Sequence, residues 1–420
     1  MVLPGATPAE DAVSATPHAP TPDASAVHRT PVADLDGRVI GYTVVVDPDR
    51  PPGVDVDAVY LGLDLANLVA DRYAFIPATP SMLDGYLPEP VVPGRLVLML
   101  PHGFANSPGA IGRAGALRGL GMSLALTGFR GDLAQNALLS HVAFVVVDAG
   151  PSGPVLPPLV HEAHTHGVRV LATNVATEVE LDVCRASGVD GLMDGPAGAF
   201  GPMAQPAVPT QRGSRDGRST RVLRAGEAQC LTILNLLHQP DSSPADVAQV
   251  IETDPVLTLR VLHLVNSGVY ALSHQVDTVR QAVVLLGPTE ISTLVTALAL
   301  EAQPGAMDRL WFILARAMSC EVLADDNAAY TVGMLSALAA QLGVPVDAVL
   351  EKVGVSDVVA DAIAREAGPL GQVLRAVRAH ERSDPDGVIA AGLDPVAVSH
   401  VYLTCLRDAL SIARTVTREG

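Results

Sequence analysis

The feature that most constrains the fold is a change in the spacing of apolar residues near residue 222. Before it, short apolar runs rich in β-branched residues alternate with segments of helical length. Beyond it, apolar residues recur only at helical spacing, and we find no convincing strand. At 420 residues the chain is also too long for one ordinary domain. The sequence therefore predicts an α/β domain followed by an all-helical domain.

The first domain is predicted to contain parallel strands that are buried on both faces. Its apolar runs are nearly continuous, which is typical of strands covered by helices on either side. The runs cover residues 39–46, 73–76, 96–100, 123–126, 142–147 and 168–171. Residues 107–120 and 157–166 would form crossover helices. A (β/α) barrel is the natural closure, although about 170 residues is short for a complete one.

Helix start and stop signals are frequent in the second domain. Ser243-Pro244, with Asp246 following, is typical of a capped helix start. Asp254-Pro255 opens a second, mostly apolar helix, and Asp277 can cap a third. Gly287-Pro288 is expected to end one helix and begin the next.

Two segments without periodicity flank the first domain. Residues 1–27 are rich in Ala, Pro, Thr and Asp, and we expect them to be disordered. Residues 201–224 form a Pro/Gly/Arg-rich linker. It joins the predicted first domain, residues 28–200, to the predicted second domain, residues 225–415. Five arginines in or next to it favour a solvated linker, with a docking site for an acidic partner as the alternative. They are Arg212, Arg215, Arg218, Arg221 and Arg224.

Charge and composition narrow the class of function. The formal net charge of −18 opposes contact with a phosphate backbone, so nucleic acid is not an expected partner. No apolar run reaches the roughly 18 residues needed to span a bilayer. Because the N-terminus lacks the pattern of a secretory signal, we expect a cytoplasmic protein that does not bind membranes. The four cysteines are scattered, which favours buried thiols over disulfides or a zinc site.

Residues 251–295, within a region of about 225 to 415, resemble an HDOD domain. The matching residues are Asp254-Pro255, Leu262, Val265-Asn266-Ser267, Tyr270, Val279, Gln281-Ala282 and Leu286-Gly287. HDOD domains resemble metal-dependent HD phosphohydrolases but lack their His–Asp doublet. None of the twelve histidines here precedes an Asp, and Ser336-Ala337 stands where the doublet might be sought. The resemblance therefore implies a helical domain without metal or cofactor.

Asn266 and Ser267 are the most prominent polar residues of this match. They could end a buried helix and satisfy its terminal backbone groups, or they could contact a partner. Together with Arg260 they form a candidate interaction or structural motif.

Residues 28–200 resemble an EAL domain, a barrel phosphodiesterase that opens cyclic di-GMP with two Mg²⁺ or Mn²⁺ ions. The match lies in Arg29, Pro31, Asp36-Gly37, Val39 and Gly41-Tyr42. It gains weight from its place directly before an HDOD domain. EAL chemistry requires carboxylates, an amide and a lysine at the carboxyl ends of the strands.

The resemblance implies that nearly all of these groups have been replaced. The corresponding positions are Thr43, Asp47, Pro77, Met99, Thr127-Gly128, Val146, Asp148, Thr173 and Ala176. Asp148 retains a carboxylate of the family, and one carboxylate cannot bind two divalent ions. Asp47 would repel a phosphate where the family has an arginine. We therefore expect neither catalysis nor cyclic di-GMP binding.

Three histidines, His161, His164 and His166, are close enough in sequence to suggest a metal site. Their spacing is not that of HExxH, and a solvated helix end is the favoured interpretation.

The leading hypothesis is a non-catalytic bacterial regulatory protein that binds protein partners of unknown identity. The alternative is a ligand sensor that signals through the HDOD domain. Its barrel mouth, made more apolar by Pro77, Met99 and Val146, would bind a nucleotide or another small molecule. An enzyme with displaced catalytic residues is a third hypothesis.

Overall fold

The computed structural model describes residues 26–48, 50, 52–86, 95–150, 153–193, 225–238, 242–253, 255–266, 276–300 and 305–418. The predicted linker with its arginines, Ser267 and almost all of the predicted N-terminal tail lie outside these residues. The side chain of Arg260 also lies outside the description.

Eight strands close into a barrel in chain order, which confirms the predicted barrel fold. They are β1 (Val27–Asp34), β2 (Val39–Val46), β3 (Tyr73–Pro77), β4 (Leu96–Leu100), β5 (Ser123–Leu126), β6 (Phe144–Asp148), β7 (Arg169–Thr173) and β8 (Gly191–Leu192). The pairs from β2 to β8 are parallel, whereas β1 is antiparallel to both β2 and β8. The six predicted runs correspond to β2–β7.

Short connections explain how an eight-stranded barrel fits into so few residues. The helices are α1 (Val56–Gly62), α2 (Leu65–Val69), α3 (Pro80–Leu83), α4 (Ala110–Gly119), α5 (Leu133–Asn136), α6 (Leu156–Thr165) and α7 (Glu178–Ser187). The expected crossovers at 107–120 and 157–166 correspond to α4 and α6. The others span at most ten residues, so several strands are connected by little more than one helical turn.

The lumen of the barrel is filled with apolar side chains. Inward-facing residues of successive strands form one buried cluster: Val32, Phe75, Val97, Ala125, Phe144, Val146, Leu171 and Met193. The rings of Phe75 and Phe144 meet edge to face with their centroids 5.1 Å apart. This packing closes the barrel around a solid core.

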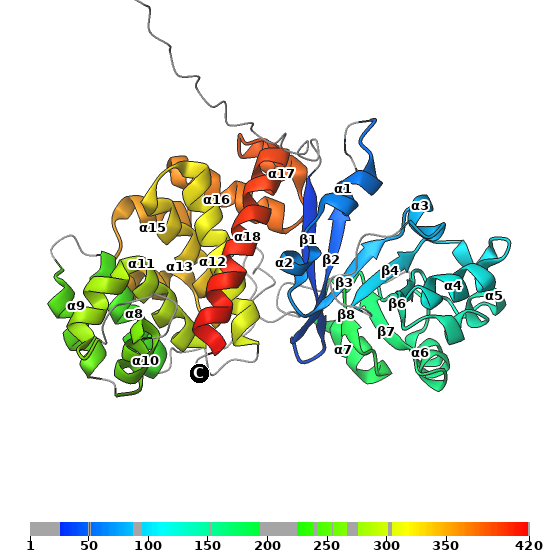
Figure 1. Ribbon diagram of the computed structural model, residues 1–420, viewed down its shortest axis with the longest axis horizontal. Helices are drawn as coiled ribbons and strands as arrows, with labels where there is room; N and C mark the ends of the chain where they lie inside the picture. The colour runs from blue at the N-terminus through cyan, green and yellow to red at the C-terminus, as the bar shows by residue number, and fades with distance from the viewer. Residues whose placement is uncertain are drawn as a thin grey trace, which may run out of the picture.

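Beyond residue 193, the elements that the structure describes are all helices, as predicted. They are α8 (Ala225–His238), α9 (Pro244–Glu252), α10 (Pro255–Asn266), α11 (Val279–Leu300), α12 (Ala306–Ala324), α13 (Asn327–Leu342), α14 (Val346–Val353), α15 (Asp357–Ala364), α16 (Gly368–Glu381), α17 (Pro385–Ala390) and α18 (Pro395–Arg418). Figure 1 shows this helical half beside the barrel, with α18 on the side that faces β1 and α2.

Most of the predicted helix boundaries are confirmed. Ser243 and Asp246 form a capping box at the start of α9. Gly287 has a φ of 78° and divides α11 into two helical segments. Asp277 was the wrong residue for the next cap, because the hydroxyl of Thr278 accepts the Gln281 amide at 3.3 Å.

The last helix is long and apolar enough over 395–414 to cross a membrane, judged by length and composition alone. Its buried side chains recur at helical spacing and form one face: Val398, Tyr402, Cys405, Leu406, Ala409, Leu410 and Ala413. This face packs on α12 and α16, so α18 is a core helix of the helical half.

A glycine lies where α12 and α13 cross closely. A Cβ added to Gly333 would lie 2.8 Å from both the Cα of Ala317 and the carbonyl oxygen of Arg316, two backbone atoms that cannot swing aside. We therefore expect Gly333→Ala to lower the free energy of unfolding by about 1–3 kcal/mol, measured by urea denaturation. Gly112→Ala is the control: Gly112 lies in α4 with no atom near its would-be Cβ, so about 0.5–1 kcal/mol of stabilisation is expected. Equal effects at both positions would contradict the packing argument.

Candidate functional site

The positions that the EAL resemblance singled out gather at one end of the barrel, which we call the mouth. Because β2 to β8 are parallel, their carboxyl ends meet there. Pro77 and Thr173 end β3 and β7, Met99 is next to last in β4, and Thr127 follows β5. Asp148 ends β6.

Hydroxyl groups at the mouth bind neighbouring strands instead of facing a ligand. Thr127 donates to the Leu100 carbonyl at 2.6 Å, and Thr173 donates to the Val147 carbonyl at 3.3 Å. The hydroxyls of Thr43 and Thr30 lie 3.0 Å apart across β1 and β2. The oxygens at these positions therefore stabilise the sheet.

The carboxylate of Asp148 is held by its own loop. Its Oδ1 accepts the Gly150 amide at 2.9 Å and the side-chain amide of Asn174 at 3.1 Å. Asn174 has a φ of 58°, and nothing in the sequence singled it out. Ala176, also at the mouth, donates its backbone N–H to Glu180 at 2.8 Å.

Two other predicted positions also have structural roles. Gly128 has a φ of 64°, which favours glycine, and an added Cβ would displace the ring of His102. Asp47 is buried, and its charge acts on His28.

The donor set at the mouth does not fit a pair of divalent ions. Hard cations need several oxygen ligands, and carboxylates supply most of them. At the positions that the EAL resemblance singled out, the side chains are mainly hydroxyls and apolar groups, and Asp148 already accepts two hydrogen bonds. Across the described residues, no group of three His, Cys, Asp or Glu side chains could hold a metal.

The histidines of α6 have separate partners. His164 Nε2 lies 2.8 Å from Asp190, and His166 Nδ1 lies 3.0 Å from the Glu162 carbonyl. His161 is exposed on the same helix.

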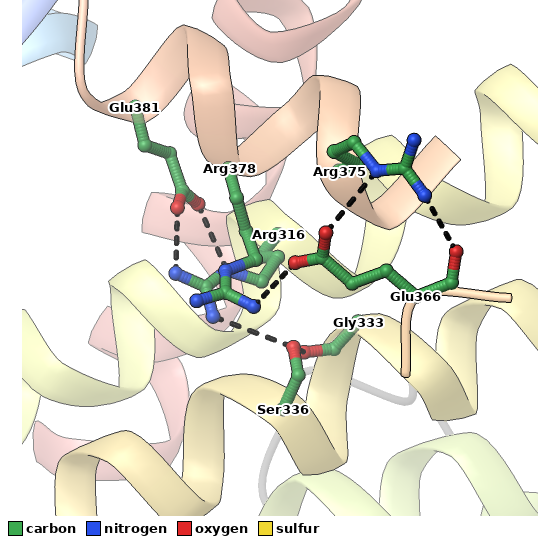
Figure 2. A network of polar contacts seen from close by, with 7 residues as sticks. All are labelled: Arg316, Gly333, Ser336, Glu366, Arg375, Arg378 and Glu381. Atoms are coloured by element: carbon green, nitrogen blue, oxygen red, sulfur yellow. Dashed lines mark hydrogen bonds and ion pairs between the residues drawn. The ribbon is translucent and has the colours of Figure 1, made fainter. Parts of the chain in front are cut away.

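In the helical half, a buried ion pair lies where a metal doublet might have been sought. Arg316 is 1% exposed and binds Glu381 through two hydrogen bonds of 3.0 and 2.6 Å (Figure 2). A third hydrogen bond of 3.3 Å joins Arg316 to Ser336. Burial acts to lower the pKa of Arg316, but the charge of Glu381 outweighs it and raises that pKa. A permanent cation therefore contacts Ser336.

A second ion cluster lies beside the first and holds the turn between α15 and α16. Glu366 has a φ of 51° and binds Arg375 at 3.2 Å and Arg378 at 2.7 Å (Figure 2). Arg375 also donates to the Glu366 carbonyl at 2.8 Å. The two arginines thus hold a strained backbone conformation in place.

The side chain of Asn266 bonds to the backbone of Val276, further along the chain, and the predicted satisfaction of the terminal groups of its own helix stays a prediction. At the end of α10, its amide donates to the Val276 carbonyl at 2.8 Å and accepts the Val276 N–H at 2.7 Å. This pair of hydrogen bonds joins the two ends of the segment between them. Contact with a partner stays a prediction for Asn266, Ser267 and Arg260.

The barrel and the helical half meet in a group of side chains that we call the junction: Arg29, Tyr42, Arg72, Asp308 and Trp311. Asp308 is 2% exposed, and its two oxygens accept from Tyr42 at 3.2 Å and from Arg72 at 2.9 Å. The guanidinium of Arg29 lies 3.4 Å from the ring centroid of Tyr42 and 4.1 Å from that of Trp311. A buried charge pair and stacked aromatic rings therefore fix the two halves together.

Two buried histidines extend the contact between the halves. The rings of His28 in β1 and His380 in α16 lie 5.2 Å apart, and Tyr402 packs on His380. Burial, assisted by His28, lowers the pKa of His380 to about 3. Burial also lowers the pKa of His28, against an opposing effect of Asp47. Both rings are therefore neutral at pH 7.

Comparison with known families confirms the HDOD resemblance: residues 228–340 match the HDOD domain. A relative from Bacillus subtilis, the uncharacterized protein YuxH, is 24% identical over 411 residues, which are 90% of this chain and 97% of that protein. The cyclic di-GMP phosphodiesterase CdgJ of Vibrio cholerae is 28% identical over 159 residues, 36% of this chain and 37% of CdgJ.

The similar solved structures are EAL domains. That of Mycobacterium smegmatis DcpA is 16% identical, with a TM-score of 0.33, and the alignment covers 41% of this chain and 90% of that chain. The EAL domain of Xanthomonas citri FimX, solved with cyclic di-GMP, is 18% identical, with a TM-score of 0.33 and coverages of 46% and 91%.

The junction predicts an unequal effect of two Asp→Asn substitutions. Asp308→Asn removes a buried charge and leaves Arg72 with only the exposed Asp71, at 3.7 Å, as an acidic partner, so we expect a loss of about 1–3 kcal/mol in the free energy of unfolding. Asp182→Asn, in an exposed pair with Arg185, should change stability by less than about 0.5 kcal/mol. Urea denaturation followed by the fluorescence of Trp311, the only tryptophan, reports on the junction directly. Equal losses would contradict the role given to Asp308.

The neutral histidines predict a loss of stability in acid. Between a pH of about 6.5 and 3, unfolded His380 binds a proton that the folded state excludes, so the free energy of unfolding falls as the pH drops through this window. Each such ring lowers the free energy of unfolding by at most about 1.4 kcal/mol for each pH unit within this window. Comparing urea midpoints at pH 7.5 and 5.5, we expect a smaller decrease for His380→Phe than for the parent chain. His161→Gln, on the surface of α6, should keep the parent's decrease, and an unchanged decrease in His380→Phe would refute the assignment.

Proposed function

We propose that this protein is a non-catalytic regulator in cyclic di-GMP-related bacterial signalling, and that it acts by binding protein partners. One observation carries the proposal: the mouth of the barrel presents hydroxyl and apolar groups where phosphodiester hydrolysis by paired metals needs carboxylates. Asp148, the carboxylate that remains from the family pattern, is bound by Gly150 and Asn174.

The residues at the family's metal-site positions have structural roles in this barrel. Thr127 and Thr173 tie adjacent strands, and Val146 belongs to the packed lumen. Restoring a metal site would require new ligands on several strands at once, because two-metal hydrolysis depends on ligands that hold both ions in place. We therefore infer that this barrel keeps its fold but does not carry out metal-dependent phosphodiester hydrolysis.

The helical half supports the same proposal. The Arg316–Glu381 pair is buried, and Arg316 donates to Ser336, so a fixed positive charge lies at that position. Such a charge opposes binding of a divalent cation in its vicinity. The pair serves the packing of α12, α13 and α16 instead.

The junction explains why two non-catalytic domains would be kept together. If the two halves separated, the charges of Asp308 and Arg72 would become exposed to water or stay buried without a partner. Because this is costly, the two halves present one surface of fixed geometry. A partner that contacts both halves would bind without first ordering them. Protein contact is therefore the function that this architecture suits.

A ligand sensor with its site at the mouth is the second candidate. Pro77, Met99 and Val146 make this end of the barrel more apolar than a nucleotide site would be. The packed lumen beneath them leaves little room for a ligand, which favours the scaffold over this candidate. Cytoplasmic location and the absence of nucleic-acid and membrane partners remain part of the proposal.

The test is calorimetry of the full chain with cyclic di-GMP in the presence of Mn²⁺, with product measured in the same sample. The names of CdgJ and of the FimX complex make cyclic di-GMP the appropriate probe. We expect no heat of binding and no product, and Asp148→Asn should behave like the parent chain. Formation of product would contradict the proposal, and so would binding of cyclic di-GMP that Asp148→Asn abolishes. A search for protein partners that finds none, together with phosphodiesterase activity, would also contradict it.

A further inference from the structure

A cationic cavity of about 370 Å³ lies at the base of the barrel, the end opposite the mouth. Arg72 directly precedes β3, Arg95 directly precedes β4, and Arg169 is the first residue of β7. Arg38 comes from the turn before β2, and Asp308 of α12 closes the side that faces the helical half. The cavity is therefore built from both halves of the molecule.

Strand alternation places the arginines over the lumen. Phe75, Val97 and Leu171 point into the packed interior. Residues two positions earlier on the same strands point the same way, and these are Tyr73, Arg95 and Arg169. The guanidinium carbons of both arginines lie 5.1 Å from the ring centroid of Tyr73, and that of Arg169 lies 4.1 Å from that of Phe144. Stacking on these rings holds the charges in place before any ligand arrives.

The lining carries an excess of positive charge. It includes four arginines and two aspartates, Asp34 and Asp308, which leaves two net positive charges in a chain whose formal net charge is −18. Both aspartates are already engaged: Asp308 binds Arg72 and Tyr42, and Asp34 accepts the backbone amides of Asp36 and Arg38 at 3.0 and 2.8 Å. Among the residues that the structure describes, the side chains of Arg38, Arg95 and Arg169 form no ion pair.

Three guanidinium groups that have no carboxylate partner among the described residues surround this cavity and repel one another, and a bound anion would relieve this repulsion. Guanidinium groups match the oxygens of phosphate in bidentate hydrogen bonds. The volume is at the small end of the range for ligand pockets, about 300–1,000 Å³, which favours a compact ligand. Two net positive charges call for at least two negative charges on the ligand.

We propose that this cavity binds a compact phosphate-bearing metabolite with at least two negative charges. Its Tyr73, Val39 and Ile40 offer an apolar wall for the organic part, and Arg38, Arg95 and Arg169 bind the phosphate. Arg72 lines the cavity and also binds Asp308, so a ligand bound there lies next to the ion pair that joins the two halves. This inference goes beyond the proposed function and does not depend on it, since the mouth takes no part.

The experiment uses the full chain and inorganic diphosphate in magnesium-free buffer at constant ionic strength, with binding followed by thermal melting and by calorimetry. We expect saturable binding that raises the melting temperature. A double variant, Arg38→Gln with Arg95→Gln, should bind diphosphate at least tenfold more weakly. Both side chains are exposed, so the variant should fold, and its circular dichroism checks this.

Arg130→Gln is the matched control, because Arg130 is an exposed arginine near the mouth, after β5. It should bind diphosphate like the parent chain. Absence of binding at millimolar diphosphate, or equal weakening by the double variant and by Arg130→Gln, would overturn the proposed site. Citrate, a polycarboxylate, is expected to bind more weakly, and citrate that bound as tightly as diphosphate would overturn the assignment to phosphate.

Discussion

The arrangement of the two halves depends on the buried carboxylate of Asp308. A charge that is 2% exposed is stable only when it is paired and hydrogen-bonded, and both of its partners, Tyr42 and Arg72, come from the barrel. The helix that carries Asp308 also carries Trp311, whose indole N–H donates to Leu406 of α18 at 2.7 Å. The junction is thereby tied into the core of the helical half, and the two domains form one body.

The two ends of the barrel differ in what they offer to a ligand. At the mouth, threonine hydroxyls bind backbone carbonyls, and Asp148 is held by its own loop. At the base, Arg95 and Arg169 are stacked on aromatic rings without carboxylate partners among the described residues. Between the two ends the lumen is solid. The anion proposed for the base would therefore act where the helical half is in contact, independently of the mouth.

Sequence periodicity was sufficient to predict β2–β7, the capping box at Ser243 and the break at Gly287, because these features depend on near neighbours in the chain. It missed β8, which has two residues, and β1, whose sequence VHRTPVAD lacks an apolar run. The cap at Thr278 was missed because two adjacent residues can both cap and only the backbone geometry decides between them. The junction was beyond prediction, since Arg72 and Asp308 are 236 residues apart. The cationic cavity had a usable signal, namely arginines at the starts of several strands.

The proposed function requires that the mouth does not hold the metal pair of a phosphodiesterase. The most direct measurement is a Mn²⁺ titration of the full chain followed by electron paramagnetic resonance, which distinguishes free from protein-bound ion. We expect Mn²⁺ to stay free at micromolar concentrations and Asp148→Asn to leave the titration unchanged. Two bound Mn²⁺ ions per chain, released by Asp148→Asn, would contradict the proposed function.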